Sequence, residues 1–436
     1  MVSVISFPRR EVRVIGLITV AHFLSHFYLT ALVPFYQAIL SEIGGNWTTL
    51  SWGIVAYVVC TGVLQTPMGF LVDRVGGRPV LIGGMLILAG GIGSIGFATE
   101  LWHLIALMAV AGIGNSVFHP ADYSIISISV EENRLGKAFS FHSFGGSSGM
   151  VSGPLVMAIA INFDVPWRFA INAVGAIGIF VAITLFLLSG IFSEKNSGKR
   201  RDAPPPFREL LTSRPLLLMF LFYVCASGAN AGIVHFSVPA LGQLYSIPVV
   251  AAAIALTVYQ ICSLSCVLPG GFLADSTKRH DLIMIVCLGI AGLMIALIGF
   301  DFFPFWMVVG IIGIGGAMRG LVTAARDVNV RHSAGKHSVG TVFAFVSTGF
   351  LFGGAVSLPI YGILLDLGTP EIVFWASACF SLFSVGTVVL HKKSRVSAKN
   401  KSKENRDSLY LTYNPARFGD HYKNYFNDKK KSKNFK

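Results

Sequence analysis

Twelve long apolar runs constrain this chain more than any other feature of its sequence. A helix that crosses a membrane needs about 20 mostly apolar residues, because each residue rises about 1.5 Å along the helix axis. We therefore predict an all-α membrane protein with twelve transmembrane helices. The predicted spans are residues 12–40, 49–72, 79–98, 101–128, 135–163, 169–192, 215–241, 247–273, 281–300, 305–330, 338–365 and 371–391.

The composition agrees with a lipid environment. Hydrophobic residues make up 53% of the chain and charged residues only 13%, whereas a soluble domain carries about 25% charged residues. The net charge of +13 does not indicate nucleic-acid binding, because the basic residues lie in loops and in the C-terminal tail rather than on one soluble face. The six cysteines lie inside apolar runs, without the spacing of a metal or redox site.

The distribution of lysine and arginine predicts the orientation, because cytoplasmic loops retain these residues. With the N-terminus inside, all but three of the 34 basic residues fall in inside segments or the tail. The exceptions are Arg168 in an outside loop and Arg319 and Arg326 within a span. We therefore expect both termini in the cytoplasm and a monomer surrounded by membrane lipids, most simply in a bacterial inner membrane.

The two halves of the chain resemble each other. Gly69-Phe-Leu-Val-Asp73 follows the second span, and Gly271-Phe-Leu-Ala-Asp275 follows the eighth, 202 residues later. We predict four parts: a six-helix bundle at 1–192, a cytoplasmic linker at 193–214, a second six-helix bundle at 215–391 and a disordered basic cytoplasmic tail at 392–436. Two such pseudo-symmetric repeats predict a solute site between them, near the middle of the membrane.

The loop after the second span carries the most specific motif. Gly69, Asp73, Arg74, Gly76 and Arg78 occur in the run GFLVDRVGGRPVL. This run resembles G-x-L-a-D-r-x-G-r-k-x-x-l, the signature loop of the major facilitator superfamily, although a glycine replaces one basic position. The resemblance covers residues 10–392 and implies a gating role for this loop. On physical grounds we expect the first glycine to let helix ends approach and Gly76 to form a tight turn.

The second copy of this motif keeps Gly271 and Asp275 but lacks the glycine turn. In the fifth span, Gly149, Gly153 and Pro154 resemble the G-x-x-x-G-P motif of proton-driven efflux members of the superfamily. The same residues also suit close helix packing, so the motif leaves two interpretations open. The runs GIGNSVFHP and RLGKAFSFHSFGG are similar to the fosmidomycin-resistance-like drug-export branch.

A few ionisable residues lie well inside predicted spans, where a charge costs about 2.5–3.5 kcal/mol even on lenient insertion scales. They are Asp122 in the fourth span and Arg319, Arg326 and Asp327 in the tenth. Such residues are expected to face a cavity or a partner. Asp122, Arg326 and Asp327 could instead lie near the cytoplasmic end and reach water.

Histidines add to this set. His22 and His26 lie four residues apart on the first span, His119 precedes Asp122 in the fourth, and His142 lies in the fifth. Histidine titrates near neutral pH, so these residues are candidates for a proton pathway, with ordinary packing as the alternative. No metal is expected, because the His22–His26 pair has no third ligand near it in the sequence.

These observations predict a secondary active transporter that moves a small solute by alternating access, by proton-coupled efflux. The alternative is proton-coupled uptake of an anionic metabolite such as a carboxylate, held by Arg319 and Arg326. A third interpretation is a membrane enzyme or assembly factor built on a transporter fold. The sequence shows no nucleophile or set of metal ligands that would support it. We expect no enzyme activity, no cofactor and no nucleic-acid partner; the expected partners are the solute, protons and lipids.

Overall fold

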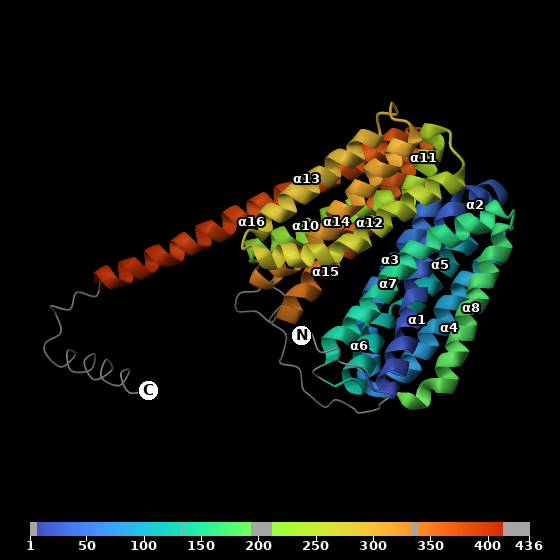
Figure 1. Ribbon diagram of the computed structural model, residues 1–436, viewed down its shortest axis with the longest axis horizontal. Helices are drawn as coiled ribbons and strands as arrows, with labels where there is room; N and C mark the ends of the chain where they lie inside the picture. The colour runs from blue at the N-terminus through green and yellow to red at the C-terminus, as the bar shows by residue number, and fades with distance from the viewer. Residues whose placement is uncertain (1–6, 132–133, 193–211, 334–338, 413–436) are drawn as a thin grey trace. The chain divides into compact units, whose positions relative to one another are not determined.

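The computed structural model describes residues 7–131, 134–192, 212–333 and 339–412, and the regular structure within these residues is entirely helical (Figure 1). The α-helices are α1 Arg9–Ala31, α2 Tyr36–Ile43, α3 Trp47–Val75, α4 Gly77–Ser94, α5 Leu101–Asn115, α6 Phe118–Ser129, α7 Leu135–Asn162, α8 Trp167–Leu188, α10 Arg214–Ala231, α11 Ser237–Tyr245, α12 Val249–Ser276, α13 His280–Ile298, α14 Phe305–Ser333, α15 Val339–Asp366 and α16 Pro370–Thr412.

The described residues contain 12 helical segments long and apolar enough to cross a membrane, which confirms the predicted number. Three spans are built from consecutive helices. In the first span a 3-10 turn at Val33–Phe35 joins α1 to α2, and it contains Pro34, which cannot continue a helical hydrogen-bond ladder. The fourth span changes from α5 to α6 just before Phe118, and the seventh contains a π turn at Gly232–Phe236.

The same helix pairs recur in the two halves. In the first half α1 packs along α7, and in the second half α10 packs along α15. Glycines allow both approaches: a Cβ at Gly149 would lie 2.0 Å from the Phe23 carbonyl oxygen, and one at Gly353 would lie 2.2 Å from that of Val224. These equivalent contacts support the predicted fold of two pseudo-symmetric six-helix halves.

Helices α3 and α7 of the first half pack against α15 and α12 of the second. Asp366, at the end of α15, accepts hydrogen bonds from the Trp47 and Thr48 amides at 2.7 and 2.9 Å, and from the Thr48 hydroxyl. These amides belong to the first turn of α3, where backbone N–H groups lack helical partners and favour a negative charge. At the other end of α3 and α12, Phe70 and Phe272 are 67% and 78% exposed.

The C-terminal region differs from its prediction in one respect. Residues 392–412 were expected to be disordered, but α16 continues to Thr412 (Figure 1). This stretch contains neither glycine nor proline, and extending an existing helix avoids the cost of nucleating a new one. Residues 413–436 lie outside the described residues, as does most of the linker predicted at 193–214.

Candidate functional site

Three helices of the first half bring five predicted site residues together. His22 and His26 lie one turn apart on α1, and His119 and Asp122 lie one turn apart on α6. His142 joins them from α7. We call these five residues the histidine–aspartate cluster.

Asp122 is the central group of this cluster. One of its carboxylate oxygens, Oδ2, lies 3.5 Å from His22 Nδ1 and 3.8 Å from His142 Nε2. The His22 ring stacks on the His142 ring with 3.9 Å between centroids, and His119 approaches His22 edge-on at 5.3 Å. Asp122 is fully buried, which removes the alternative that it reaches water at the end of its helix.

Small residues on α7 make room for the imidazole rings. A Cβ at Gly146 would lie only 2.6 Å from His22 Nε2, so a larger residue would displace the ring. One turn on, the Gly149 contact with Phe23 holds α1 and α7 at close range. The geometry of the cluster therefore depends on the glycine pattern of α7 as well as on the ionisable residues.

Most polar atoms of the cluster lack a hydrogen-bond partner among the described residues. They are His22 Nδ1, His26 Nδ1, His119 Nδ1, Asp122 Oδ1 and Oδ2, and His142 Nδ1 and Nε2. The separations from Asp122 to the two histidines exceed the usual hydrogen-bond range. A buried carboxylate without a close donor is costly unless a cation or a proton neutralises it. The cluster thus has the chemistry of a cation site.

A small cavity of about 30 Å³ borders the cluster, with room for at least one water molecule. Its lining includes Tyr57 and Asn115, two polar residues that the sequence analysis did not select. The Tyr57 hydroxyl is buried without a hydrogen-bond partner among the described residues, and Asn115 donates to Thr61 at 3.3 Å. Their sequence signal is weak, because tyrosine and asparagine carry no charge that would stand out in an apolar span.

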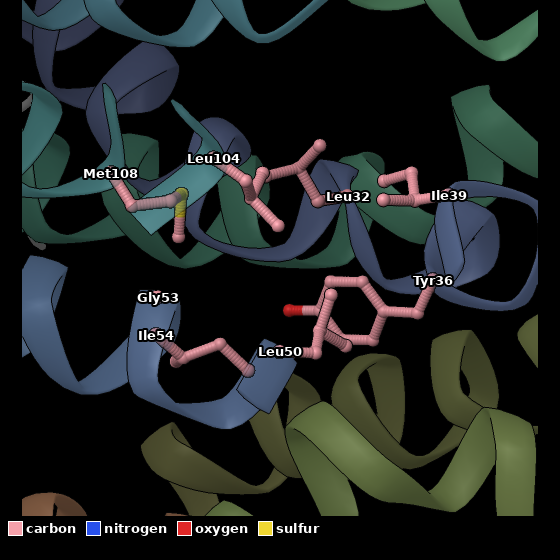
Figure 2. Close-up of a pocket in the computed structure, with 8 residues that line it drawn as sticks. All are labelled: Leu32, Tyr36, Ile39, Leu50, Gly53, Ile54, Leu104 and Met108. Atoms are coloured by element: carbon pink, nitrogen blue, oxygen red, sulfur yellow. The ribbon is translucent and has the colours of Figure 1, made fainter. Parts of the chain in front are cut away.

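A second pocket lies in the same half and is apolar. Figure 2 shows the Tyr36 ring beside Leu50, with Leu32, Leu104 and Met108 across the pocket. Its volume of about 10 Å³ is too small for a solute. We interpret it as a packing gap where α1, α2, α3 and α5 meet.

The predicted residues of the tenth span lie apart from the cluster, on α14 of the second half. Arg326 Nε donates to Asp327 Oδ1 at 2.9 Å, and the guanidinium lies 5.3 Å from the centre of the Tyr223 ring. Arg319 interacts with Tyr259 on α12. No hydrogen bond or ion pair among the described residues links these side chains to the histidine–aspartate cluster.

The signature loop is partly as predicted. Gly76 has φ of +87°, a conformation that favours glycine, and it ends α3 before α4 begins. The expectation that Gly69 permits a close approach is wrong for this conformation, because a Cβ there would meet Pro120 only at an ordinary 3.9 Å. The close contact is made by Gly77, where a Cβ would lie 2.9 Å from Ile125 and 3.1 Å from the Ala121 carbonyl oxygen.

This tight contact is consistent with a glycine where the family pattern has a basic residue. A side chain at this position would press on α6 next to Asp122 and require Ile125 and the Ala121 carbonyl to shift. Asp73 and Arg74 are exposed at the end of α3. In the second copy of the motif Gly271 has open space around it and Asp275 is exposed, while the neighbouring Gly270 packs against the Leu321 carbonyl oxygen.

The glycine–proline motif of α7 makes close contacts with α1. Pro154 has no N–H, so it cannot bond to the carbonyl of Met150 one turn earlier. The Thr30 hydroxyl of α1 donates to that carbonyl at 3.1 Å. Gly153 lies against the same threonine, since a Cβ there would be 2.2 Å from Thr30 Oγ1.

Two ion-pair sites were missed by the sequence analysis. Arg134 donates two hydrogen bonds of 2.8 Å to Glu11, which joins the start of α1 to the loop before α7. This pairing raises the pKa of the Arg134 guanidinium. At the other end of the bundle, Arg168 donates to Glu42 and to the Gly96 and Ala98 carbonyl oxygens. The two ion pairs join residues 123 and 126 positions apart, so sequence spacing gave no signal.

Two bundles of transmembrane helices, with the histidine–aspartate cluster buried inside the first, define an integral multi-pass membrane protein. The family model "Major Facilitator Superfamily" matches residues 18–237 and 220–430, and the chain belongs to this superfamily of transporters.

Curated relatives with drug-resistance names are similar to this chain. The Fosmidomycin resistance protein of Escherichia coli is 22% identical over 88% of this chain and 93% of that protein. The Multidrug resistance protein MdtH of Cronobacter sakazakii is 27% identical over 27% of this chain, and the Multidrug resistance protein B homolog of Mycobacterium tuberculosis is 23% identical over 55%. The latter two matches span only 31% and 44% of the relatives' own length.

Solved structures support the fold. A bacterial homologue of the human lysosomal transporter Spinster, in an inward-facing and unoccupied conformation, superposes with a TM-score of 0.72 at 14% identity. That match covers 90% of this chain and 99% of the homologue. The occupied inward-facing form gives a TM-score of 0.70 at 15% identity. The comparisons thus show the superfamily and its fold, and the drug-resistance names belong to relatives that are 22–27% identical to this chain.

Proposed function

We propose that this protein exports a small solute across a bacterial inner membrane by proton antiport, with alternating access to a site between its two halves. The drug-resistance names of several relatives support the direction of transport. The same names support a small drug-like molecule, rather than a nutrient, as the proposed substrate class.

The observation that carries the proton coupling is the burial of Asp122. Its carboxylate is fully enclosed and lies nearest to imidazole nitrogens of His22 and His142. An ionised carboxylate in this position is costly, and one proton on Asp122 or on an adjacent imidazole removes the net charge. A proton taken up on one side of the membrane and released on the other would thus change the stability of the cluster in each conformation.

The contacts around the cluster offer a route from protonation to movement. Helix α6 carries Asp122 and touches the signature loop through Gly77. Helix α7 carries His142 and packs against α12 of the second half. Neutralising the cluster changes the forces on both helices, and we propose that this biases the rocking of one half against the other.

The contacts between the halves suit an inward-facing state. Asp366 holds the start of α3 at the end that the charge distribution predicts to be outside. Phe70 and Phe272, at the predicted cytoplasmic ends of α3 and α12, are largely exposed. In this state we expect the solute to enter from the cytoplasm and the outer contacts to open in the next step.

Uptake of an anionic metabolite remains the rival proposal. It requires Arg319 and Arg326 to hold a carboxylate, but Arg326 is already paired with Asp327 and lies over Tyr223. This pairing leaves less positive charge for an anion, so the geometry favours efflux.

A whole-cell assay separates the two proposals. Deleting the gene from its host should lower the growth-inhibiting concentration of at least one drug in a panel that includes fosmidomycin, and re-expression of the wild-type chain should restore it. Re-expression of the Asp122→Asn variant should not. A deletion strain with unchanged drug tolerance and reduced accumulation of a labelled carboxylate would reject efflux in favour of uptake.

A further inference from the structure

We propose that the histidine–aspartate cluster is a binding site for one divalent transition-metal ion, such as Zn²⁺, with His22, His119 and His142 as ligands and the Asp122 carboxylate beside them. The prediction of no metal rested on sequence spacing, in which His22 and His26 have no third ligand nearby. The fold supplies the other ligands from α6 and α7. The inference does not depend on the transport function proposed above.

The ligand geometry supports this assignment. One ring nitrogen from each of His22, His119 and His142 lies within 4.8 Å of the others. In a tetrahedral zinc site with bonds of about 2.0–2.1 Å, nitrogen ligands lie about 3.4 Å apart, so side-chain shifts of roughly 1 Å suffice. Asp122 lies outside this three-histidine set, but its Oδ2 is 3.5 and 3.8 Å from the nearest nitrogens of His22 and His142, so a carboxylate that can neutralise an ion stands beside two of the ligands.

The unsatisfied polar atoms provide a second, independent argument. Asp122, His142 and His22 are 0%, 1% and 4% exposed, and each has at least one side-chain atom without a hydrogen-bond partner among the described residues. Polar atoms at such depth are normally paired. A dication held between the rings would satisfy several of these atoms at once and would neutralise the carboxylate.

The chemistry of the donors restricts the kind of ion. Three imidazoles with one carboxylate suit Zn²⁺, Ni²⁺, Co²⁺ or Cu²⁺, whereas Mg²⁺ and Ca²⁺ prefer oxygen ligands throughout. The adjoining cavity of about 30 Å³ gives an ion or a bound water access to the His22 and His119 side of the cluster. A bound ion would tie α1, α6 and α7 together.

The test is metal binding by the purified full-length protein, prepared through an affinity tag without histidine and stripped with a chelator. Isothermal titration with Zn²⁺ should show one site per chain, and Co²⁺ at the same site should give the visible absorption of a tetrahedral complex. Mg²⁺ should not compete. His142→Ala should weaken Zn²⁺ binding by about 100-fold or more, because even residues behind the direct ligands contribute about 10- to 100-fold.

A matched control lies in the same chain. His235→Ala alters a buried histidine of the second half, outside the histidine–aspartate cluster. This variant should bind Zn²⁺ within about threefold of the wild type, well under the loss expected for a ligand. If His142→Ala aggregates during gel filtration, the test uses His142→Gln instead, because glutamine keeps a polar side chain of similar size.

The proposal is overturned if the wild type binds no Zn²⁺, or if the His142 variants bind it as tightly as the wild type does. Transport is measured separately in metal-free proteoliposomes. If the protein shows flux in proteoliposomes but no Zn²⁺ binding in the titration, the metal site is rejected and the proposed function stands. If it binds Zn²⁺ but shows no flux, the metal site stands and the proposed function is rejected.

Discussion

At the scale of single residues, Asp122 has the largest consequences for function. It is fully buried, and its neighbours in α1 and α7 include the imidazoles of His22 and His142, so a change in its charge acts directly on both helices. The exposed Asp164, in the loop between α7 and α8, provides a comparison without such neighbours.

We expect Asp122→Asn to remove most of the transport driven by a pH gradient and to leave the protein folded. The amide keeps the size of the side chain but cannot take up or release a proton, and it removes the cost of a buried charge. Flux should fall by about tenfold or more, which corresponds to about 1.4 kcal/mol in the transport barrier. The thermal midpoint in detergent should be unchanged or higher. Full flux in this variant, with Asp164→Asn as the matched control, would remove Asp122 from the mechanism.

At the scale of helices, the contact between the end of α15 and the start of α3 is the clearest gate. Asp366 caps the first turn of α3 with hydrogen bonds to two backbone amides and one hydroxyl. Farther along α3, Val58 lies close to Gly354 of α15: a Cβ at Gly354 would be 3.9 Å from Val58 Cγ1. Opening this end requires that the Asp366 contacts be released.

Asp366→Asn should favour the state that is open at this end. A carboxylate at an exposed helix N-terminus contributes about 0.3–1 kcal/mol, so the open population should rise by about two- to fivefold. The measurement is the labelling rate of a cysteine at Val58 by a membrane-impermeant maleimide, in a background with the six native cysteines replaced by serine. Asp164→Asn serves as the control. An unchanged or slower rate would show that Asp366 does not hold this gate.

Much of this helix arrangement was predictable, because apolar run length and glycine patterns act locally. The number of spans followed from the lengths of the apolar runs. The turn at Gly76 followed from a motif that needs positive φ. The sequence marks His22, His119, Asp122 and His142 as candidate site residues. It does not show that they contact one another, because those contacts depend on how α1, α6 and α7 pack. Glu11 with Arg134, and Thr30 with Met150, could not be found at all, because nothing in the sequence marks contacts more than 100 residues apart.

At the scale of the whole molecule, the protein combines one asymmetric feature with a symmetric fold. Equivalent helix pairs and equivalent glycines recur in both halves, but the buried histidine–aspartate cluster belongs only to the first half among the described residues. The equivalent region of the second half carries the Arg326–Asp327 pair instead. We infer that the first half holds the coupling ion while both halves shape the path of the solute.

The central claim, that a pH gradient drives a solute through this protein, is tested most directly in proteoliposomes. Purified protein is reconstituted, a pH gradient is imposed, and flux is measured for a small panel of hydrophobic drugs and organic anions. The account predicts that at least one drug moves against the direction of proton flow and that collapsing the gradient with an ionophore stops it. Flux that is unchanged by the ionophore, or flux of organic anions in the same direction as protons and of no drug, would contradict it.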